Sequence, residues 1–287
     1  SDFFNITSII DTSKKNLYRA KKDFPLVNTG RNYKDILKIK DISLVIISTP
    51  TKTHAEIAKF AIEQDKHVLV EKPLSLTLNE VTKLENLAKK NKKLLFVDYP
   101  FLFSGSINYI KKMIDSKKYG DLLEIESYRE QAPIRKDCNV VWDLGVHDIS
   151  ILNYLLNKKP KSTKSIKIKN LNSHLADTAY LNLIYKNKLN VFIKNSWISP
   201  NKIRLIKFKF KKAIIHCNEN EPIYKIKIFK KRDKSRLEYS LEIPEINLTE
   251  PLSLMVDYIY KSIIHKNNRI FKNNLNFNIT KILKKLS

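Results

Sequence analysis

Glycine is scarce in this sequence, and its few positions are widely separated. The 287 residues contain only 4 glycines, at positions 30, 105, 120 and 145. In a GxGxxG turn, the lack of side chains lets the backbone approach a phosphate group closely. These four positions exclude such a turn anywhere in the printed chain.

Cysteine is rarer still, because only Cys138 and Cys217 are present. The two are far apart, form no CxxC pair and have no histidine-rich neighbourhood, so the sequence predicts neither a disulfide framework nor a metal site. Long apolar runs are missing as well, since no stretch approaches the length of about 18 residues that crosses a bilayer. Residues 1–10 also lack the basic region of a signal segment. We expect a soluble, cytoplasmic protein without a membrane partner.

Acidic residues are in short supply. The chain has 29 Asp and Glu against 54 Lys and Arg, which gives a formal net charge of +25. A chain this basic can bind nucleic acid through phosphate contacts alone, and composition leaves that remote alternative open. The lysines, however, are scattered through every segment rather than gathered in one stripe, and no known nucleic-acid-binding module is present. We therefore predict no nucleic-acid partner.

Strand-like and helix-like segments alternate through residues 1–100. The apolar pattern predicts strands at 5–10, 44–48, 68–70 and 94–97, helices at 15–22, 54–64 and 78–90, and a short segment at 33–37. This alternation is typical of a doubly wound parallel sheet, so we expect a Rossmann-like domain over residues 1–100. Ligands of such sheets bind at the carboxyl ends of the strands.

From residue 101 the pattern changes to a long series of strands. Helices are predicted at 105–116, around His147 to about 156, at 250–265 and at 279–286, with strands at 122–128 and repeatedly between 165 and 243. We expect a second domain over residues 101–287 with a large, mainly antiparallel sheet, and hence an α/β plus α+β protein. An uncovered face of this sheet favours a homo-oligomer, with Val191, Ile193 and Phe208 as candidate contact residues.

Three motifs carry the functional information. Glu71, Lys72 and Pro73 follow the apolar run HVLV, and a lysine held beside a proline at the end of a buried strand is a positioned cation and proton donor. Upstream, the segment LVIISTP ends at Pro50 and leads through TKTH into a helix. Downstream, WDLGVHDISIL places Asp143 and His147 four residues apart, on one face if the segment is helical.

In this order and spacing, the three motifs resemble the Gfo/Idh/MocA family of nicotinamide-dependent sugar and cyclitol dehydrogenases over nearly the whole chain. The resemblance implies that His147 takes the proton from a substrate hydroxyl as hydride leaves the same carbon, and that Asp143 tunes this histidine. Lys72 would stabilise the negative charge that develops on the oxygen. The implied cofactor-binding residues are Asp11, Thr49, Pro50, His54, Glu71 and Lys72.

Asp11 bears on the choice of cofactor. A carboxylate after that strand accepts hydrogen bonds from ribose hydroxyls and repels a 2′-phosphate, which favours NAD, while the adjacent Lys14 and Lys15 keep NADP possible. A plain cap of the following helix is the competing interpretation. For the turn at Thr49 and Pro50, the competing interpretation is an ordinary strand-to-helix turn capped by Thr53.

The resemblance also indicates a missing part. The strand that ends at Asp11 corresponds to the second strand of the family, so we interpret the sequence as lacking one amino-terminal βα unit of roughly 30 residues, the unit that carries the GxGxxG turn.

The substrate is the least determined feature. By resemblance, Lys72, Asp143 and His147 contact it. Arg129 and Arg135 lie in segments that could border the pocket, and such cations suit a diphosphate, as in a nucleotide-linked sugar. Lys136, Lys202 and Arg204 lie in similar segments, and each of these cations is equally compatible with a solvated surface. We predict an oxidoreductase that acts on a hydroxyl or keto carbon of a sugar, cyclitol or nucleotide-sugar. A catalytically silent, sugar-binding relative remains the alternative.

Overall fold

The computed structural model describes residues 3–171, 174–232, 238–266, 270–271 and 274–287. The chain forms two compact units. Unit 1 comprises Ser1–Asp98 and Met255–Phe277, and unit 2 comprises Tyr99–Leu254 and Asn278–Ser287. Among the described residues, no helix combines the length and the apolar character required to cross a membrane.

Unit 1 contains the parallel strands that the alternating pattern predicts. One sheet pairs β1 with β2, and a second has the order β3-β4-β5, all in parallel register. The strands are β1 (Ser8–Ile10), β2 (Asn28–Gly30), β3 (Leu44–Ile47), β4 (His67–Val70) and β5 (Leu95–Val97). The helices are α1 (Lys14–Asp23), α2 (Tyr33–Ile36), α3 (Thr51–Glu63) and α4 (Leu78–Lys90). The predicted Rossmann-like arrangement is confirmed. Among the strands of unit 1, only β2 was not predicted, because it lacks apolar residues.

The core of unit 1 explains why its helices form where they do. Helix α4 begins after Thr77, whose hydroxyl accepts a hydrogen bond from the Glu80 amide, and it buries Val81, Leu84 and Ala88 along one stripe. Strand β4 lies between β3 and β5, and Val68 and Val70 are fully buried in it. Its carboxyl end is therefore a rigid base for the residues that follow.

The carboxyl-terminal part of the chain returns to unit 1, whereas the sequence placed all of residues 101–287 in the second domain. Helix α7 (Pro251–Ile264) enters unit 1 at Met255, and the Phe271 ring contacts Phe96 of β5 with centroids 5.5 Å apart. Helix α8 (Leu275–Leu286) leads into unit 2. Local periodicity predicts a helix but not the unit against which it packs.

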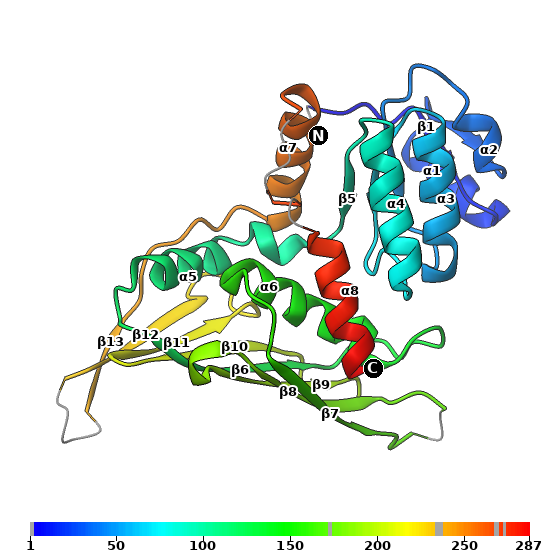
Figure 1. Cartoon of the computed structure of the whole chain (residues 1–287). Coiled ribbons are helices and arrows are strands. Elements are labelled where there is room, and N and C mark those ends of the chain that lie inside the picture. Colours follow the sequence, from blue (N-terminus) through cyan, green and yellow to red (C-terminus); the bar gives the residue numbers. More distant parts are fainter. Residues whose placement is uncertain (1–2, 172–173, 233–237, 267–269, 272–273) are drawn as a thin grey trace. The chain divides into compact units, whose positions relative to one another are not determined.

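Unit 2 is built on an eight-stranded sheet of order β13-β12-β11-β10-β6-β9-β8-β7. Neighbouring strands are antiparallel except for the parallel pair β6–β9. The strands are β6 (Leu122–Glu130), β7 (Ser162–Ile168), β8 (Thr178–Ile184), β9 (Asn190–Ser196), β10 (Ile203–Phe210), β11 (Ala213–Asn218), β12 (Ile226–Lys231) and β13 (Tyr239–Glu242). Helices α5 (Gly105–Ser116) and α6 (Val146–Leu156) lie over one face of this sheet (Figure 1).

The structure corrects the predicted contact residues on the open face. Val191 and Phe208 are fully buried and Ile193 is nearly so, which places all three on the side that the helices cover. Because side chains alternate along a strand, the neighbouring positions point to the other face. There, Tyr180 and Phe192 are about half exposed, at 45% and 47%. The prediction of an open face stands, but the residues assigned to it were on the wrong side.

Candidate active site

Lys72 directly follows the turn residue Glu71 at the carboxyl end of β4. The Glu71 amide donates to the Ile47 carbonyl of β3 at 2.8 Å, and the Lys72 amide donates to the Glu71 carboxylate at 3.2 Å. The Lys72–Pro73 peptide is cis, Pro73 is buried, and Lys72 itself is half-buried. The two hydrogen bonds hold the main chain that leads into Lys72.

The neighbouring strand β3 ends in the turn that carries Thr49 and Pro50. Both residues are exposed, and helix α3 begins directly after them at Thr51. The Thr53 hydroxyl lies 2.8 Å from both the Thr49 hydroxyl and the Pro50 carbonyl oxygen. Thr53 therefore ties the turn together, and the expectation that it caps the helix is wrong, since the cap position is Pro50 and has no side-chain hydrogen bond.

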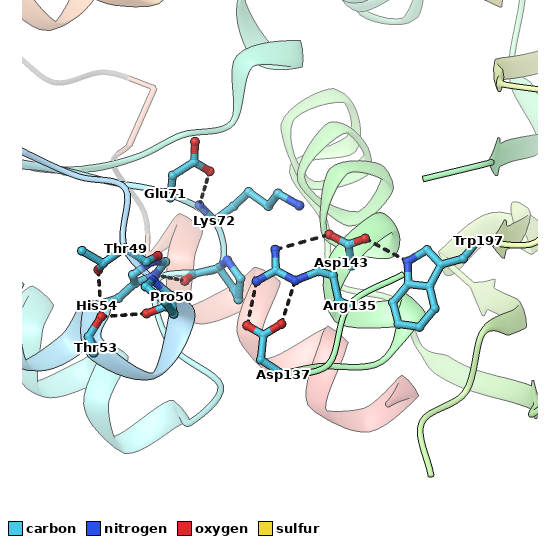
Figure 2. Close-up of polar contacts among 11 residues, drawn as sticks. Thr49, Pro50, Thr53, His54, Glu71, Lys72, Arg135, Asp137, Asp143 and Trp197 are labelled. Carbon is cyan, nitrogen blue, oxygen red and sulfur yellow. Dashed lines mark hydrogen bonds and ion pairs between the residues drawn. The ribbon is translucent and has the colours of Figure 1, made fainter. Parts of the chain in front are cut away.

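His54 occupies a different position from the ligand-facing one that the resemblance implied. His54 is only 1% exposed. Its Nδ1 atom lies 2.8 Å from the Pro73 carbonyl oxygen, and its Nε2 atom lies 2.7 Å from the Thr49 carbonyl oxygen. Figure 2 shows the ring seated between these two turns. Both ring nitrogens are engaged by the protein's own backbone.

Asp11 stands at the carboxyl end of β1 with a charged, accessible carboxylate. Its Oδ1 accepts a hydrogen bond from the Ser13 amide at 2.7 Å, and Oδ2 accepts one from the Asn16 side chain at 2.8 Å. The Ser13 amide first, and Asn16 second, hold the pKa of this carboxyl below its usual value. Ser13, rather than Asp11, is the cap of α1. A negative charge at this place fits the ribose hydroxyls of a dinucleotide. Gly30, however, is the single glycine of residues 1–98, so these residues contain no glycine-rich turn for the pyrophosphate of the dinucleotide.

Asp143 and His147 lie one turn apart on a continuous helical stretch. A π-helical turn, Val141–Gly145, runs directly into α6, and the Asn139 side chain accepts hydrogen bonds from the Val141 and Trp142 amides at its start. Such turns occur frequently at functional sites. The predicted shared helix is therefore present, with Asp143 buried and His147 half-buried.

The carboxylate of Asp143 is held by two partners from elsewhere in unit 2. The indole Nε1 of Trp197 donates to Oδ2 at 2.9 Å, and Nη1 of Arg135 lies 3.7 Å from Oδ1 (Figure 2). Arg135 also forms hydrogen bonds with Asp137. These bonds are the main cause of the raised pKa of Arg135, while burial acts in the opposite direction. The sequence singled out Asp143 and Arg135, whereas it assigned no contact to Trp197, which immediately follows β9.

Arg129 has a role inside the protein, in contrast to its predicted contact with a substrate diphosphate. Its side chain is 2% exposed and pairs with the equally buried Asp148 at 3.2 Å, while its guanidinium carbon lies 4.6 Å from the centre of the Phe101 ring. The Phe101 ring in turn meets the His147 ring edge to face, with centroids 5.3 Å apart. Arg129 therefore supports the packing around His147 instead of facing a ligand.

Asp148 organises a buried polar network next to His147. Its carboxylate also accepts hydrogen bonds from Ser127 at 2.8 Å and from the Asn195 amide nitrogen at 2.9 Å. Gly145 makes room for Asn195, since a Cβ at that glycine would lie 2.9 Å from the Asn195 Oδ1 atom. The close approach at Gly145 is thus made by a side chain of β9.

Of the remaining predicted cations, Arg204 lies close enough to feel the charges of Arg129, Asp148 and Asp143. Arg204 donates to the main-chain carbonyls of Glu130 and Gln131, and burial is the first cause of its lowered pKa. Lys136 and Lys202 are exposed. None of these three contacts Asp143 or Asp148 through a hydrogen bond among the described residues.

Known families match both units of the chain. Residues 1–99 match the family model described as an oxidoreductase family with an NAD-binding Rossmann fold, and residues 107–218 match the Gfo/Idh/MocA carboxyl-terminal domain. The chain belongs to the Gfo/Idh/MocA oxidoreductase family. This result confirms the resemblance and the predicted class of cofactor, a nicotinamide dinucleotide.

Similar proteins within the Gfo/Idh/MocA family include named dehydrogenases. A 1-carboxy-3-chloro-3,4-dihydroxycyclohexa-1,5-diene dehydrogenase of Comamonas testosteroni is 35% identical over 117 residues, 41% of this chain and 30% of that protein. Inositol 2-dehydrogenase of Salmonella typhimurium is 27% identical over 137 residues, 46% of this chain and 41% of that protein. The chain thus spans less than half the length of these two relatives.

Solved structures of the Gfo/Idh/MocA type share the whole fold. UDP-N-acetylglucosamine 3-dehydrogenase from Acidithiobacillus ferrooxidans superimposes with a TM-score of 0.84 at 16% identity, covering 98% of this chain and 88% of that one. At this identity the likeness shows the fold alone, which agrees with the expected combination of a parallel-sheet unit and a large, mostly antiparallel sheet.

Proposed function

We propose that this protein is an NAD(P)-dependent dehydrogenase or ketoreductase that acts on a hydroxyl or keto carbon of a sugar, cyclitol or nucleotide-sugar. The observation that carries the proposal is the position of Lys72, which follows the turn residue Glu71 at the carboxyl end of the largely buried strand β4, in a chain of an oxidoreductase family. The names of the relatives, which include dehydrogenases of inositol and of UDP-N-acetylglucosamine, support the class of substrate.

The residues have distinct roles in this proposal. The nicotinamide, when bound, accepts or supplies the hydride. His147 takes the proton of the substrate hydroxyl as a general base, and Lys72 donates a hydrogen bond to the substrate oxygen as negative charge develops there. Asp143, fixed by Trp197, orients and tunes His147. In the reverse direction the same groups deliver a proton to a carbonyl.

NAD is the favoured cofactor. The ionised carboxylate of Asp11 accepts hydrogen bonds from ribose hydroxyls and repels a 2′-phosphate. Thr49, Pro50 and Glu71 lie at the carboxyl ends of β3 and β4, the edge of a parallel sheet at which ligands bind. Asp11→Ala is expected to weaken NADH binding and to reduce the preference for NAD over NADP, as measured by titration of each cofactor.

Self-association through the open face of the unit 2 sheet is a further part of the proposal. That face carries a hollow of about 800 Å³ lined by residues of four adjacent strands, among them Ile166, Tyr180 and Phe192. Ile166 is 66% exposed, so apolar surface is available for burial. A second copy of this chain, which presents the same self-complementary surface, is the proposed occupant.

The function is tested with the full-length protein and a panel of polyols. Calorimetry first shows which of myo-inositol, levoglucosan and UDP-N-acetylglucosamine the protein binds. For each compound that binds, the reduction of NAD and of NADP is then measured by absorbance. Lys72→Ala is expected to lower kcat by about 100-fold or more, whereas Lys83→Ala, an exposed lysine of α4, keeps wild-type turnover. A protein that binds a polyol but reduces neither cofactor is the silent relative instead.

A further inference from the structure

The carboxyl ends of β3 and β4 are joined by a single side chain. The two strands are hydrogen-bonded neighbours, and each is followed closely by a proline turn, Thr49–Pro50 after β3 and Lys72–Pro73 after β4. His54, in the first turn of α3, lies between the two proline turns and reaches a main-chain carbonyl in each, at 2.7 Å for Thr49 and 2.8 Å for Pro73.

The chemistry of these two contacts is unusual for a histidine. A carbonyl oxygen only accepts hydrogen bonds, and a neutral imidazole has one donor and one acceptor nitrogen. With one hydrogen, the ring would place a nitrogen lone pair against a carbonyl lone pair at hydrogen-bond distance, in a site that is 1% exposed. A ring with hydrogen on both nitrogens donates to both carbonyls at once.

We propose that His54 is a positioning residue that donates from both ring nitrogens and thereby fixes the turn of Lys72 to the turn of Thr49 and Pro50. The Pro73 carbonyl belongs to the residue after Lys72, so holding it fixes the main chain from which the lysine side chain extends. The Thr49 carbonyl immediately precedes Pro50, so the same ring fixes the edge assigned to the cofactor. This inference deepens the proposed function and rests on it only for the consequence in catalysis.

The histidine His67 provides a matched comparison within the same unit. It lies at the amino end of β4, opposite to the end that carries Lys72, and its Nδ1 accepts a hydrogen bond from the Leu94 amide at 3.0 Å. An accepting nitrogen carries no hydrogen, so His67 has at most one ring N–H. Both histidines form hydrogen bonds with the backbone, but only His54 is proposed to donate from both ring nitrogens.

The first test observes the ring hydrogens directly and needs no turnover. The full-length protein is labelled with ¹⁵N-histidine, and the signals of its 6 histidines are assigned with single substitutions. At neutral pH, His54 is expected to show an N–H correlation from each ring nitrogen, whereas His67 shows no more than one. A ring nitrogen of His54 without hydrogen overturns the double-donor clamp.

The second test separates positioning from general stability. In His54→Gln both donors sit on one nitrogen, which cannot occupy the positions of both ring nitrogens that face the two carbonyls. We expect kcat to fall about 10- to 100-fold, as for a small misplacement of a catalytic group, with the substrate KM changed less than about threefold. His67→Gln should keep kcat within about threefold of wild type.

Equal effects of His54→Gln and His67→Gln on kcat would contradict the positioning role. If the wild-type protein itself shows no turnover, the proposed function fails, but the ring-hydrogen measurement still decides whether His54 joins the two turns. Because that measurement uses the wild-type protein, a substitution that fails to fold does not remove the test.

Discussion

The indole Nε1 of Trp197 donates a 2.9 Å hydrogen bond to the carboxylate of Asp143, with both residues buried in unit 2. The bond joins the end of β9 to the π-helical turn that precedes α6, across 54 positions of sequence. It fixes one oxygen of Asp143, while Arg135 lies near the other. The orientation of the proposed catalytic helix is thus set partly by a residue to which the sequence assigned no contact.

Removal of this hydrogen bond is expected to reduce both stability and turnover. In Trp197→Phe, an aromatic ring remains but the buried carboxylate loses its donor, which should cost about 1.5–3 kcal/mol of unfolding free energy and lower kcat about 10-fold. Denaturant unfolding and steady-state kinetics measure the two effects. The control is Trp142→Phe, since the indole of Trp142 donates no hydrogen bond to any described residue. If both variants lose kcat equally, the Trp197–Asp143 bond has no special role.

Two glycines are expected to differ sharply in their tolerance of a methyl group. A Cβ at Gly105, the first residue of α5, would lie 2.0 Å from the Asn247 carbonyl oxygen, so Gly105→Ala should destabilise unit 2 by at least about 2 kcal/mol. A Cβ at Gly30 would meet only side-chain atoms at 3.7 Å or more. Gly30→Ala should therefore be neutral or stabilising by up to about 1 kcal/mol. Unfolding free energies of both variants decide the matter, and a harmless Gly105→Ala would refute the close backbone contact.

The stability of unit 2 is expected to depend on pH through Asp177, the residue before β8. Burial raises the pKa of this carboxyl, but hydrogen bonds from Leu171, Asn170 and Thr178 outweigh it, so the folded-state pKa lies below the usual 3.8. A carboxyl with a lowered folded-state pKa stabilises the fold fully above its unfolded pKa, and this contribution is lost as pH falls through the folded value. Wild type should therefore exceed Asp177→Asn in unfolding free energy most at about pH 7 and least at about pH 3.

The corresponding measurement is denaturant unfolding of both proteins at several pH values. Asp23→Asn, which changes an exposed aspartate at the end of α1, serves as the comparison for a surface carboxyl. A difference between wild type and Asp177→Asn that stays constant or grows as the solution becomes more acidic contradicts the assignment.

The open face of the unit 2 sheet is expected to mediate self-association. Phe192→Glu places a charge on this face and should convert the oligomer to a monomer in light scattering after size exclusion. Tyr18→Glu, at a 75% exposed position on α1, should leave the wild-type mass unchanged. A monomeric wild-type protein, or a Phe192→Glu variant of unchanged mass, would argue against this interface.

Much of the fold followed from local patterns, and the differences have a common physical origin. The bounds of α4 and α5 agree with the prediction because Thr77 and Gly105 mark their starts and apolar stripes define their length. Strand β2 lacks apolar residues, and the return of Met255–Phe277 to unit 1 depends on packing between distant segments. The assignment of strand faces failed for the same reason, since the alternation at Val191 and Phe208 gives two faces without saying which one the helices cover.

The candidate site shows the same division. The motifs located Lys72 at the end of β4 and placed Asp143 and His147 on one helix, because each depends on residues adjacent in sequence. The partners were not predictable, since His54 reaches Pro73 across 19 positions and Arg129 reaches Asp148 across 19 positions. Sequence alone thus indicated candidate chemical groups, while the structure was required to show that His54 and Arg129 are engaged inside the protein.

Cofactor reduction by matched variants tests the central claim most directly. The full-length protein and its Lys72→Ala, His147→Ala and Lys83→Ala variants are compared, with a polyol that all four bind by calorimetry, for reduction of NAD and NADP. The account predicts turnover by wild type and Lys83→Ala, and a loss of about 100-fold or more in kcat for the Lys72 and His147 variants. Full turnover by Lys72→Ala, or binding of the polyol by wild type without any reduction of either cofactor, would contradict it.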